Sequence, residues 1–479
     1  MRGPQLARLL GHWHALPGRR RNPDYAALAG AVRGLLADGR LPLGLRLPAE
    51  RELAESLAVS RTTVSAAYRE LRDSGHLNSR RGAGSWTTLP TGHRVAGSGL
   101  WTPEDDLDVI DLGQAALPAP PELMHAARQA VEDLPRYLAG AGYHPVGLAE
   151  LREAVAASYC ARGLETHADQ ILITNGTQHA LDLVLRLTVP VGAGVLVESP
   201  TYPNALAALA ARRARLSTHG IGAGGWDAEL LLSTIRQGRP QLAYLIPEFH
   251  NPTGHLMPTE LRERLVVAAQ ATGTDLIIDE SFADLALDGG PTPPPVAVFD
   301  RRSRVISIGG MSKPYWGGLR IGWVRASAPL VQRLAAARVG VDMSSPVLDQ
   351  LVAVRLLAQA AAIVPARRAQ LAAQRDALLA AVAELLPEWR ITPPAGGVTL
   401  WAELDGPISS ALARAAERLG VRLAPGPRFG LDGTLERFMR LPFTLPVDQL
   451  IEAVHRIAAA RYDLDYAATP RWEAPQVIA

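Results

Sequence analysis

From about residue 109 almost to its end, the chain alternates short apolar runs rich in β-formers with longer stretches rich in Ala, Leu and Arg. The short runs have the length of strands and the longer stretches have the length of helices. Strands that alternate with helices form a mainly parallel sheet, because parallel neighbours need a crossover connection. We therefore predict an α/β fold for 109–466. The expected strands include Gln170–Thr174, Gly194–Glu198, Leu242–Pro247, Asp275–Asp279 and Val305–Gly309.

A change of composition divides the chain before that region. Residues 89–108 are rich in Pro, Gly, Thr and acids and lack sustained periodicity, which predicts a linker. Up to Arg94 there are 15 Arg against 7 acids, a balance of +8, whereas the rest carries 34 bases against 40 acids, a balance of −6. A basic first module favours a polyanionic partner, although a solvated basic face gives the same count. We also expect a basic arm at 1–22 and a tail at 467–479.

The segment between arm and linker has the pattern of a small helical domain with a hairpin. Apolar residues from Tyr25 to Leu35 share one helical face, and Pro48 starts a second expected helix. Ser60 has the character of an N-cap for a third helix, whose first turn presents Arg61 and Thr62. Such a helix fits a DNA major groove. Residues 76–86 then predict a β-hairpin with arginines and glycines at its tip.

These motifs resemble the GntR-type winged helix over residues 23–88. The resemblance is carried by LPAERELA at 47–54, SRTTV at 60–64 and RRGAG at 80–84. It implies DNA binding, with a winged helix used for protein contacts as the alternative. The DNA contacts implied by the family are Arg51, Arg61, Thr62, Arg80 and Arg81.

One lysine stands out in the large region. Of the 49 basic residues only Lys313 is a lysine, and it lies in IGGMSKPYWGGLR directly after an expected strand. A primary amine condenses with an aldehyde, whereas a guanidinium stays protonated and does not. An arginine-rich chain therefore has a chemical reason to keep a lysine at this position.

Other polar residues indicate that the aldehyde belongs to a ring that carries a phosphate. Gly176 and Thr177 open an expected helix, where backbone N–H groups and the helix dipole suit a phosphate, and Arg320 adds a bidentate donor. Asp279 ends an expected strand, where a carboxylate holds a pyridine nitrogen protonated. The Asn251 amide suits a phenolic oxygen, and the Tyr202 ring suits stacking. Taken singly, the last three also fit a helix cap, a turn residue and a core residue.

Together these residues resemble fold-type-I pyridoxal-phosphate enzymes of the aspartate aminotransferase class, over residues 109–466. The resemblance implies a large domain with a mainly parallel sheet and a smaller C-terminal α+β subdomain. It implies an internal aldimine at Lys313, a pyridinium pair with Asp279, an O3′ contact from Asn251 and stacking by Tyr202. It also implies that Arg440 binds a substrate α-carboxylate. The phosphate ligands implied are Gly176, Thr177, Ser312 and Arg320, with Tyr143 reaching a phosphate across a dimer.

Two residues depart from the pattern of that class. Phe282 stands where a tyrosine usually donates to O3′, and Gly310 stands where a phosphate-binding Ser or Thr is common. The main anchors remain, so we expect cofactor binding to survive. The two departures concern how the site tunes the cofactor for catalysis.

A winged helix, a linker and an aminotransferase-like body in this order resemble the MocR subfamily of bacterial regulators. The resemblance implies a head-to-tail homodimer that senses pyridoxal phosphate or an amino compound and binds double-stranded operator DNA with repeated half-sites. One alternative is a working transaminase with an accessory DNA module. Another is a DNA-binding repressor with a body that binds no cofactor.

The remaining sequence features concern the compartment. Cys160 is the one cysteine, so no intrachain disulfide forms and a reducing compartment is favoured. The first 21 residues lack the apolar core of a signal peptide, and no apolar run approaches the roughly 18 residues of a spanning helix. We expect a cytoplasmic protein without a membrane partner or a metal site.

Overall fold

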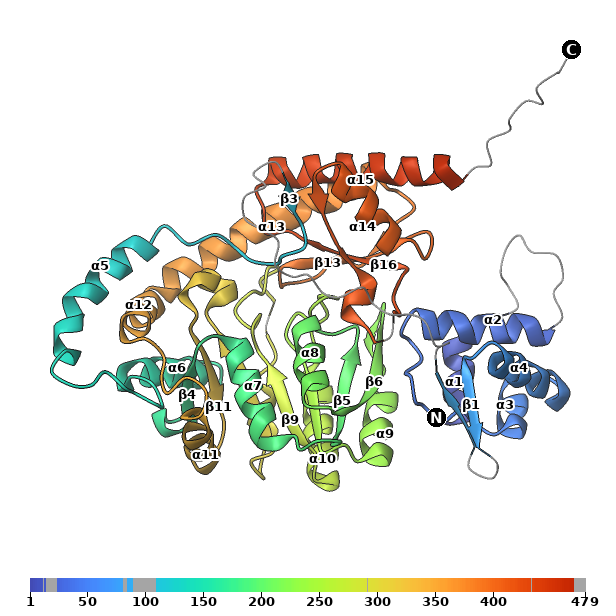
Figure 1. Ribbon diagram of the computed structural model, residues 1–479, viewed down its shortest axis with the longest axis horizontal. Coiled ribbons are helices and arrows are strands. Elements are labelled where there is room, and N and C mark those ends of the chain that lie inside the picture. The colour runs from blue at the N-terminus through green and yellow to red at the C-terminus, as the bar shows by residue number, and fades with distance from the viewer. Residues whose placement is uncertain are drawn as a thin grey trace, which may run out of the picture.

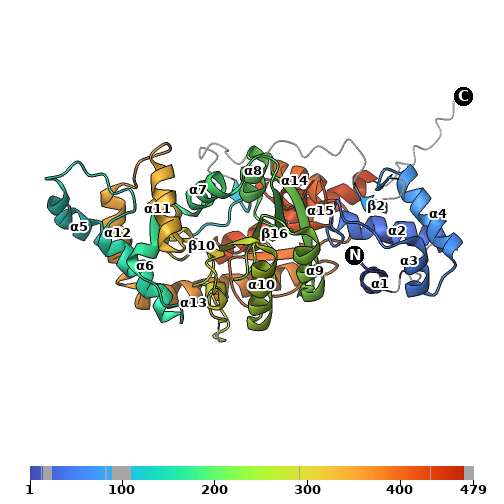
Figure 2. The same cartoon turned by 90° about the horizontal axis from the view of Figure 1, so that it is seen from below.

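The computed structural model describes residues 1–11, 13, 24–80, 84–88, 109–290, 292–431 and 433–468. A small N-terminal domain lies at one end of an elongated molecule, and helix α5 lies at the other end (Figures 1 and 2). Between them are a large α/β domain and a smaller domain that packs above one end of its sheet.

The N-terminal domain is a winged helix, as predicted. Ser60 accepts a hydrogen bond from the Thr63 amide and begins α4, and β1 pairs antiparallel with β2. Leu28, Val32 and Leu35 are buried in its core, whereas Tyr25 at the start of the same helix is exposed. The elements are α1 (Gly3–Leu10), α2 (Asp24–Ala37), α3 (Glu50–Leu57), α4 (Arg61–Asp73), β1 (Leu77–Arg80) and β2 (Gly84–Thr87).

Part of the predicted basic arm belongs to this domain. Helix α1 packs against α3, and its Leu6 and Leu10 lie in the same core cluster as Leu28. The periodic apolar residues of α1 explain this placement, because a lone short helix gains stability from burying such a face. The arginine run at 19–21 lies outside the described residues.

The large domain contains a mixed eight-stranded sheet in the order β4-β11-β10-β9-β8-β5-β6-β7. Neighbours from β10 through β9, β8 and β5 to β6 are parallel, and β11 and β7 run against them. The five predicted strands are therefore confirmed as β4, β5, β8, β9 and β10. The strands are β4 (Ile171–Thr174), β5 (Gly194–Ser199), β6 (Arg215–Gly222), β7 (Gly225–Trp226), β8 (Leu242–Leu245), β9 (Asp275–Asp279), β10 (Val305–Gly310) and β11 (Gly322–Arg325).

Helices cover both faces of this sheet. Successive residues of β9 alternate between two core clusters, Ile277 in one and Leu276 with Ile278 in the other, as the pleat requires. The first cluster includes α7 and α8, and the second includes α6, α9 and α10. The helices are α5 (Leu123–Asp133), α6 (Ala149–Ala161), α7 (Thr177–Thr188), α8 (Pro203–Ala211), α9 (Ala228–Gly238), α10 (Thr259–Thr272), α11 (Ala328–Arg338) and α12 (Val347–Leu357).

The smaller domain has α+β character, as expected. Its four-stranded antiparallel sheet has the order β12-β13-β16-β15. The residues that follow the linker also belong to this domain, because β3 pairs parallel with β14 in a separate two-stranded sheet. Its elements are β3 (Ile110–Asp111), α13 (Ala360–Leu385), β12 (Arg390–Ile391), β13 (Thr399–Glu403), α14 (Ser409–Arg418), β14 (Val421–Arg422), β15 (Ala424–Pro425), β16 (Phe438–Pro442) and α15 (Val447–Ala468). Within the described ranges no single helix has the length and apolar character to cross a membrane, and only the sharply bent pair α12–α13 meets that test.

Candidate functional site

A pocket of about 240 Å³ opens at the carboxyl ends of the parallel strands. This is where α/β sheets bind ligands, because the loops that leave the strands converge there. The sequence-predicted residues that line it are Thr177, Tyr202, Asn251, Asp279, Ser312, Lys313 and Arg320. Gly176 and Arg440 lie beside this lining and are described below.

The amine of Lys313 enters the pocket from the tight turn that follows β10. Its Nζ donates to the Ala115 carbonyl at 2.6 Å and lies 5.8 Å from the centre of the Phe282 ring. Burial, and then the nearby Arg440 guanidinium, lower the pKa of Lys313 to about 8, against the opposing effect of Asp279. The neutral, nucleophilic amine is therefore far more populated at neutral pH than in an ordinary lysine.

The Asp279 carboxylate is held at the end of β9 by two donors. Tyr244 Oη donates to Oδ2 at 2.7 Å and the Ser281 amide donates to Oδ1 at 3.0 Å. Burial raises the pKa of Asp279, and these two donors and Lys313 counteract that effect. Tyr244 was not predicted from the sequence, although a polar hydroxyl in the otherwise apolar strand Leu242–Leu245 was a signal for it.

The turn from β4 into α7 forms an anion cup. Gly176 has φ 84° and is the N-cap residue, so the free amides of the first turn point toward the pocket. A Cβ at Gly176 would lie 2.5 Å from Nη2 of Arg320, which explains the glycine. Arg320 donates from Nη2 to the Asn175 carbonyl at 2.9 Å and thereby places its guanidinium at the cup.

The structure gives a physical reason for the unusual Gly310. A Cβ at this position would lie 2.5 Å from the hydroxyl oxygen of Thr177 and 3.1 Å from the Ile321 carbonyl. The Thr177 hydroxyl thus occupies the space that a side chain at 310 would need. A side chain at 310 would therefore require the Thr177 hydroxyl to move.

Two further predicted residues carry groups suited to a ligand. Tyr202 Oη accepts from the Asn204 amide at 2.9 Å, and the Tyr202 ring faces the pocket. Oδ1 of Asn251 is buried without a hydrogen-bond partner among the described residues. A buried polar atom that lines a pocket and lacks a partner is suited to a ligand contact.

Arg440 lies on β16, where the smaller domain meets the pocket. Its Nη2 donates to the Gly113 carbonyl, its guanidinium carbon lies 4.9 Å from the Phe429 ring centre, and its Nε has no partner among the described residues. Burial, assisted by Arg428, lowers the pKa of Arg440 to about 10, so the group is still cationic at neutral pH. A buried cation with an unused donor fits an anion such as a carboxylate.

Three of the predicted DNA contacts lie on α3 and α4 of the N-terminal domain. The side chains of Arg51 and Arg61 are 83% and 72% exposed, and Thr62 at the start of α4 is exposed as well. Arg51 pairs with Glu55 at 2.9 Å and Arg61 lies 3.9 Å from Glu50. Arg80 ends β1, whereas Arg81 lies outside the described residues.

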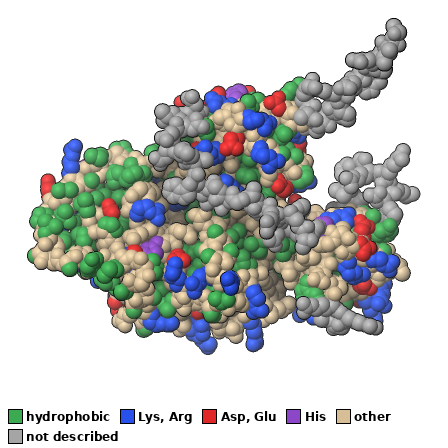
Figure 3. Space-filling view, in the orientation of Figure 1, with side chains coloured by type: hydrophobic (Ala, Val, Ile, Leu, Met, Phe, Trp, Pro, Cys, Tyr) green, Lys and Arg blue, Asp and Glu red, His purple; other side chains and the backbone are tan. Residues whose placement is uncertain are grey.

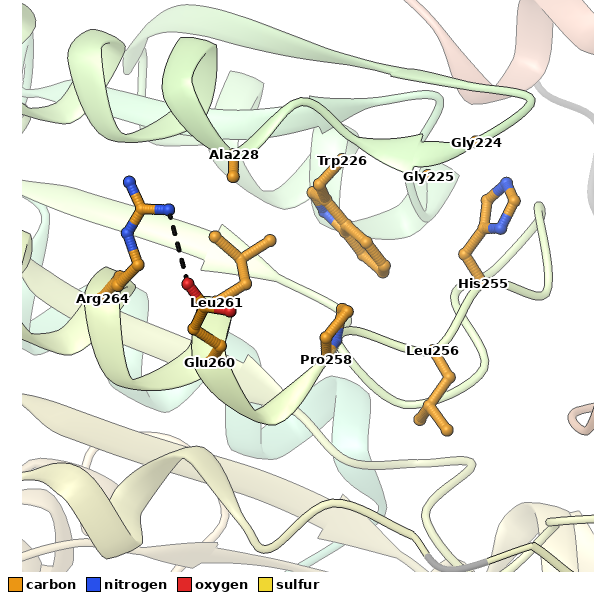
Figure 4. A pocket seen from close by; sticks show the side chains of 10 residues that line it. All are labelled: Gly224, Gly225, Trp226, Ala228, His255, Leu256, Pro258, Glu260, Leu261 and Arg264. Carbon is orange, nitrogen blue, oxygen red and sulfur yellow. Dashed lines mark ion pairs between the residues drawn. The ribbon is translucent and has the colours of Figure 1, made fainter.

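A second pocket, also of about 240 Å³, lies away from these residues (Figure 4). Trp226 and His255 lie next to each other in its lining, with ring centroids 6.4 Å apart in an edge-to-face arrangement, and Arg264 pairs with Glu260. The pocket lies between β7 and the start of α10. None of the predicted site residues lines it.

Comparison with known proteins agrees with both halves of the molecule. Residues 108–457 match the family described as aminotransferase class I and II, and residues 24–86 match bacterial regulatory proteins of the gntR family. The uncharacterized HTH-type transcriptional regulator YisV of Bacillus subtilis is 28% identical over 91% of this chain and 95% of its own length.

Two further proteins are similar to this chain over a smaller share of its length. The probable rhizopine catabolism regulatory protein MocR of Rhizobium meliloti is 30% identical over 63% of this chain and 65% of its own length. The crystal structure of LysN, the alpha-aminoadipate aminotransferase of Thermus thermophilus complexed with N-(5′-phosphopyridoxyl)-L-leucine, superposes with a TM-score of 0.69 at 30% identity. That alignment covers 75% of this chain and 94% of LysN.

Proposed function

Because the chain belongs to the aminotransferase class I and II family and carries a GntR-family domain, the architecture of the MocR subfamily, we propose that it is a pyridoxal-phosphate-binding transcriptional regulator. The observation that carries the proposal is the single lysine of the chain, placed with a lowered pKa in a pocket next to a buried carboxylate and an anion cup. A metabolic enzyme has no need of the attached DNA-binding domain.

Different residues of the pocket bind different groups of the cofactor. When bound, pyridoxal phosphate supplies an aldehyde and an electron-withdrawing ring. Lys313 supplies the amine, Asp279 keeps the ring nitrogen protonated, and Asn251 contacts the phenolic oxygen. Tyr202 stacks on the ring. The phosphate is held by Gly176, Thr177, Ser312 and Arg320.

The lowered pKa of Lys313 predicts how cofactor capture depends on pH. With a pKa of about 8, roughly one lysine in ten is neutral at pH 7, against fewer than about one in a thousand at the ordinary value. We expect the rate of capture by cofactor-free protein to rise about tenfold per pH unit below pH 8 and to level off above it. Stopped-flow absorbance after mixing with pyridoxal phosphate measures this rate. A rate that keeps rising to pH 10 contradicts the assignment.

The effector that we propose is a small amino compound with a carboxylate. Its amine competes with Lys313 for the aldehyde, and Arg440 binds its carboxylate. A ligand changes DNA affinity only through different affinities for two arrangements of the protein. Arg440 is suited to create this difference, because it lies on the smaller domain while Lys313 lies on the large one.

Arg61 is the DNA contact whose removal we expect to be the most informative. It begins the helix that we place in the major groove and is largely exposed. Arg61→Ala should weaken operator binding by about 1–3 kcal/mol if it reads a base edge, and should flatten the salt dependence by about one unit if it contacts phosphate. Arg72→Ala, at the far end of α4, is the control. Fluorescence anisotropy with duplexes selected from a random pool measures both, and an unchanged affinity and salt slope contradict the placement.

We propose a homodimer in which the apolar face around α5 is covered by a second copy. Met124, Val131, Leu138 and Tyr143 are each more than half exposed, and Figure 3 shows apolar side chains gathered at this end of the molecule. Large exposed apolar patches mark protein–protein contacts. Tyr143 lies on this face, in keeping with a role across the dimer. Two copies of the winged helix match an operator with two half-sites.

Footprinting of the protein on its own upstream region, with and without pyridoxal phosphate, tests the proposal. We expect protection of repeated half-sites and a pattern that changes with cofactor. The second candidate function is a working transaminase, because Lys313, Asp279 and Arg440 permit that chemistry. Sustained turnover of amino donors and keto acids together with no specific footprint would favour it.

A further inference from the structure

The loop after α2 rests directly on the body of the protein, next to the smaller domain (Figure 1). Gly39 is buried with φ 67°, and a Cβ there would lie 2.9 Å from both the Leu435 side chain and the Ser199 hydroxyl oxygen. A Cβ at Gly220 on β6 would lie 2.6 Å from the Gly39 carbonyl oxygen and 2.9 Å from Arg40 Cα. At Gly220 the two backbones approach so closely that a methyl group has no room, and at Gly39 the Leu435 and Ser199 side chains fill the space. We call this contact of residues 38–40 with Ser199, Gly220 and residues 435–437 the interdomain seam.

An ion pair lies at the edge of the interdomain seam. Oδ1 of Asp38 is 3.8 Å from Nε of Arg437, and both side chains are partly buried. Burial raises the pKa of Asp38, and Arg437 counteracts that effect. The interdomain seam therefore touches the large domain through Ser199 and Gly220 and the smaller domain through Leu435 and Arg437.

A short path of side chains leads from the interdomain seam to Arg440. The Phe429 ring centre lies 4.9 Å from the Arg440 guanidinium carbon, and Phe429 and Leu435 belong to the same buried apolar cluster. The Phe429 carbonyl also accepts from the Thr201 amide at 2.8 Å, which ties it to the segment before Tyr202. Two side chains, Phe429 and Leu435, thus connect the proposed carboxylate site with the DNA-binding domain.

We propose that the interdomain seam transmits occupancy of the Arg440 site to the DNA-binding domain. The seam contacts both the large and the smaller domain, so a shift of one against the other changes its fit. Packed interfaces respond to such shifts by switching rather than by deforming. The inference deepens the proposed function, because it names the residues through which an effector carboxylate changes DNA affinity.

Two matched variants on β6 test whether the interdomain seam forms in solution. Gly220→Ala adds a methyl group whose nearest neighbours belong to the DNA-binding domain, whereas a Cβ at Gly222 meets nothing within 4 Å. We expect amide hydrogen exchange in 35–41 and 434–438 to become at least fivefold faster in Gly220→Ala and to stay unchanged in Gly222→Ala. Equal exchange in the two variants overturns the proposal. If Gly220→Ala does not fold, the single variants Arg437→Asp and Asp38→Arg replace it, because each puts two like charges at the interdomain seam. The double variant reverses the ion pair and should restore protection against hydrogen exchange.

A double-mutant cycle then tests the coupling to the carboxylate site. We expect Arg440→Met to change the amide hydrogen-exchange rate in 35–41 by at least about threefold in the wild-type and Gly222→Ala backgrounds. In the Gly220→Ala background the change should be less than about 1.5-fold. These values correspond to the coupling energies usual between residues in contact. Operator affinity should follow the same pattern. No effect of Arg440→Met on 35–41 in the wild-type background overturns the proposal. The exchange measurements need no DNA. A negative exchange result therefore contradicts the role of the interdomain seam, whereas failure of the wild-type protein to bind any duplex contradicts the proposed function.

Discussion

The Lys313→Ala protein should lose the visible absorption band of covalently bound pyridoxal phosphate and should still fold and bind DNA. Lys313 is the one primary amine of a side chain in the whole sequence, so no other side chain replaces it. Among the described residues, its Nζ makes one hydrogen bond, to the Ala115 carbonyl. The loss of that bond should cost about 0.5–1.5 kcal/mol of stability. Absorbance of the dialysed protein, with circular dichroism for the fold, measures the outcome.

Lys313→Arg is the sharper companion of this variant. It keeps the positive charge and most of the side-chain length, but a guanidinium stays protonated and forms no covalent bond with the aldehyde. We expect the band to disappear in both variants, whereas a merely electrostatic role of Lys313 would leave the arginine variant able to hold the cofactor. A band that persists after dialysis in either variant contradicts the assignment.

The sequence predicted those parts of the fold that depend on local patterns. Strand β9 was predicted with its observed bounds, because an apolar run buried on both faces ends at a charged residue. Helix α4 begins where Ser60 indicates. The parts that the sequence did not predict depend on long-range packing. The role of α1 is set by its contact with α3, more than 40 residues away, and β3 is set by its pairing with β14, about 310 residues away.

The same distinction applies to the site. The positions of Lys313, Asp279 and Gly176 at one edge of the sheet were predictable, because each lies at the end of a strand or shortly after it. Tyr244 was not, because only the register of β8 beside β9 brings it to the Asp279 carboxylate. The reason for Gly310 also depends on the folded structure, because the space that a side chain at 310 would need is taken by Thr177, more than 130 residues earlier.

Arg338→Met should be among the most destabilising single substitutions in the large domain. Arg338 is fully buried, and its guanidinium donates to the Asp342 carboxylate, to the Ile173 carbonyl at 2.6 Å, and to Pro145 and Ser345. Removing one partner of a buried ion pair leaves the other charge uncompensated and costs about 3–5 kcal/mol. Urea unfolding of the cofactor-free protein measures this change in the free energy of unfolding.

The substitution should also weaken cofactor binding, because Asp342 links Arg338 to the anion cup. Oδ2 of Asp342 accepts from Nδ2 of Asn175 at 2.6 Å, directly before Gly176. Arg333→Met is the matched control, since Arg333 is exposed on the same helix and should change stability by less than about 0.5 kcal/mol. Adding Asp342→Asn to Arg338→Met removes the unpaired charge and should recover part of the loss. Equal stability of the Arg338 and Arg333 variants would contradict the predicted destabilisation, and equal cofactor affinity would show that the pair does not hold the cup in place.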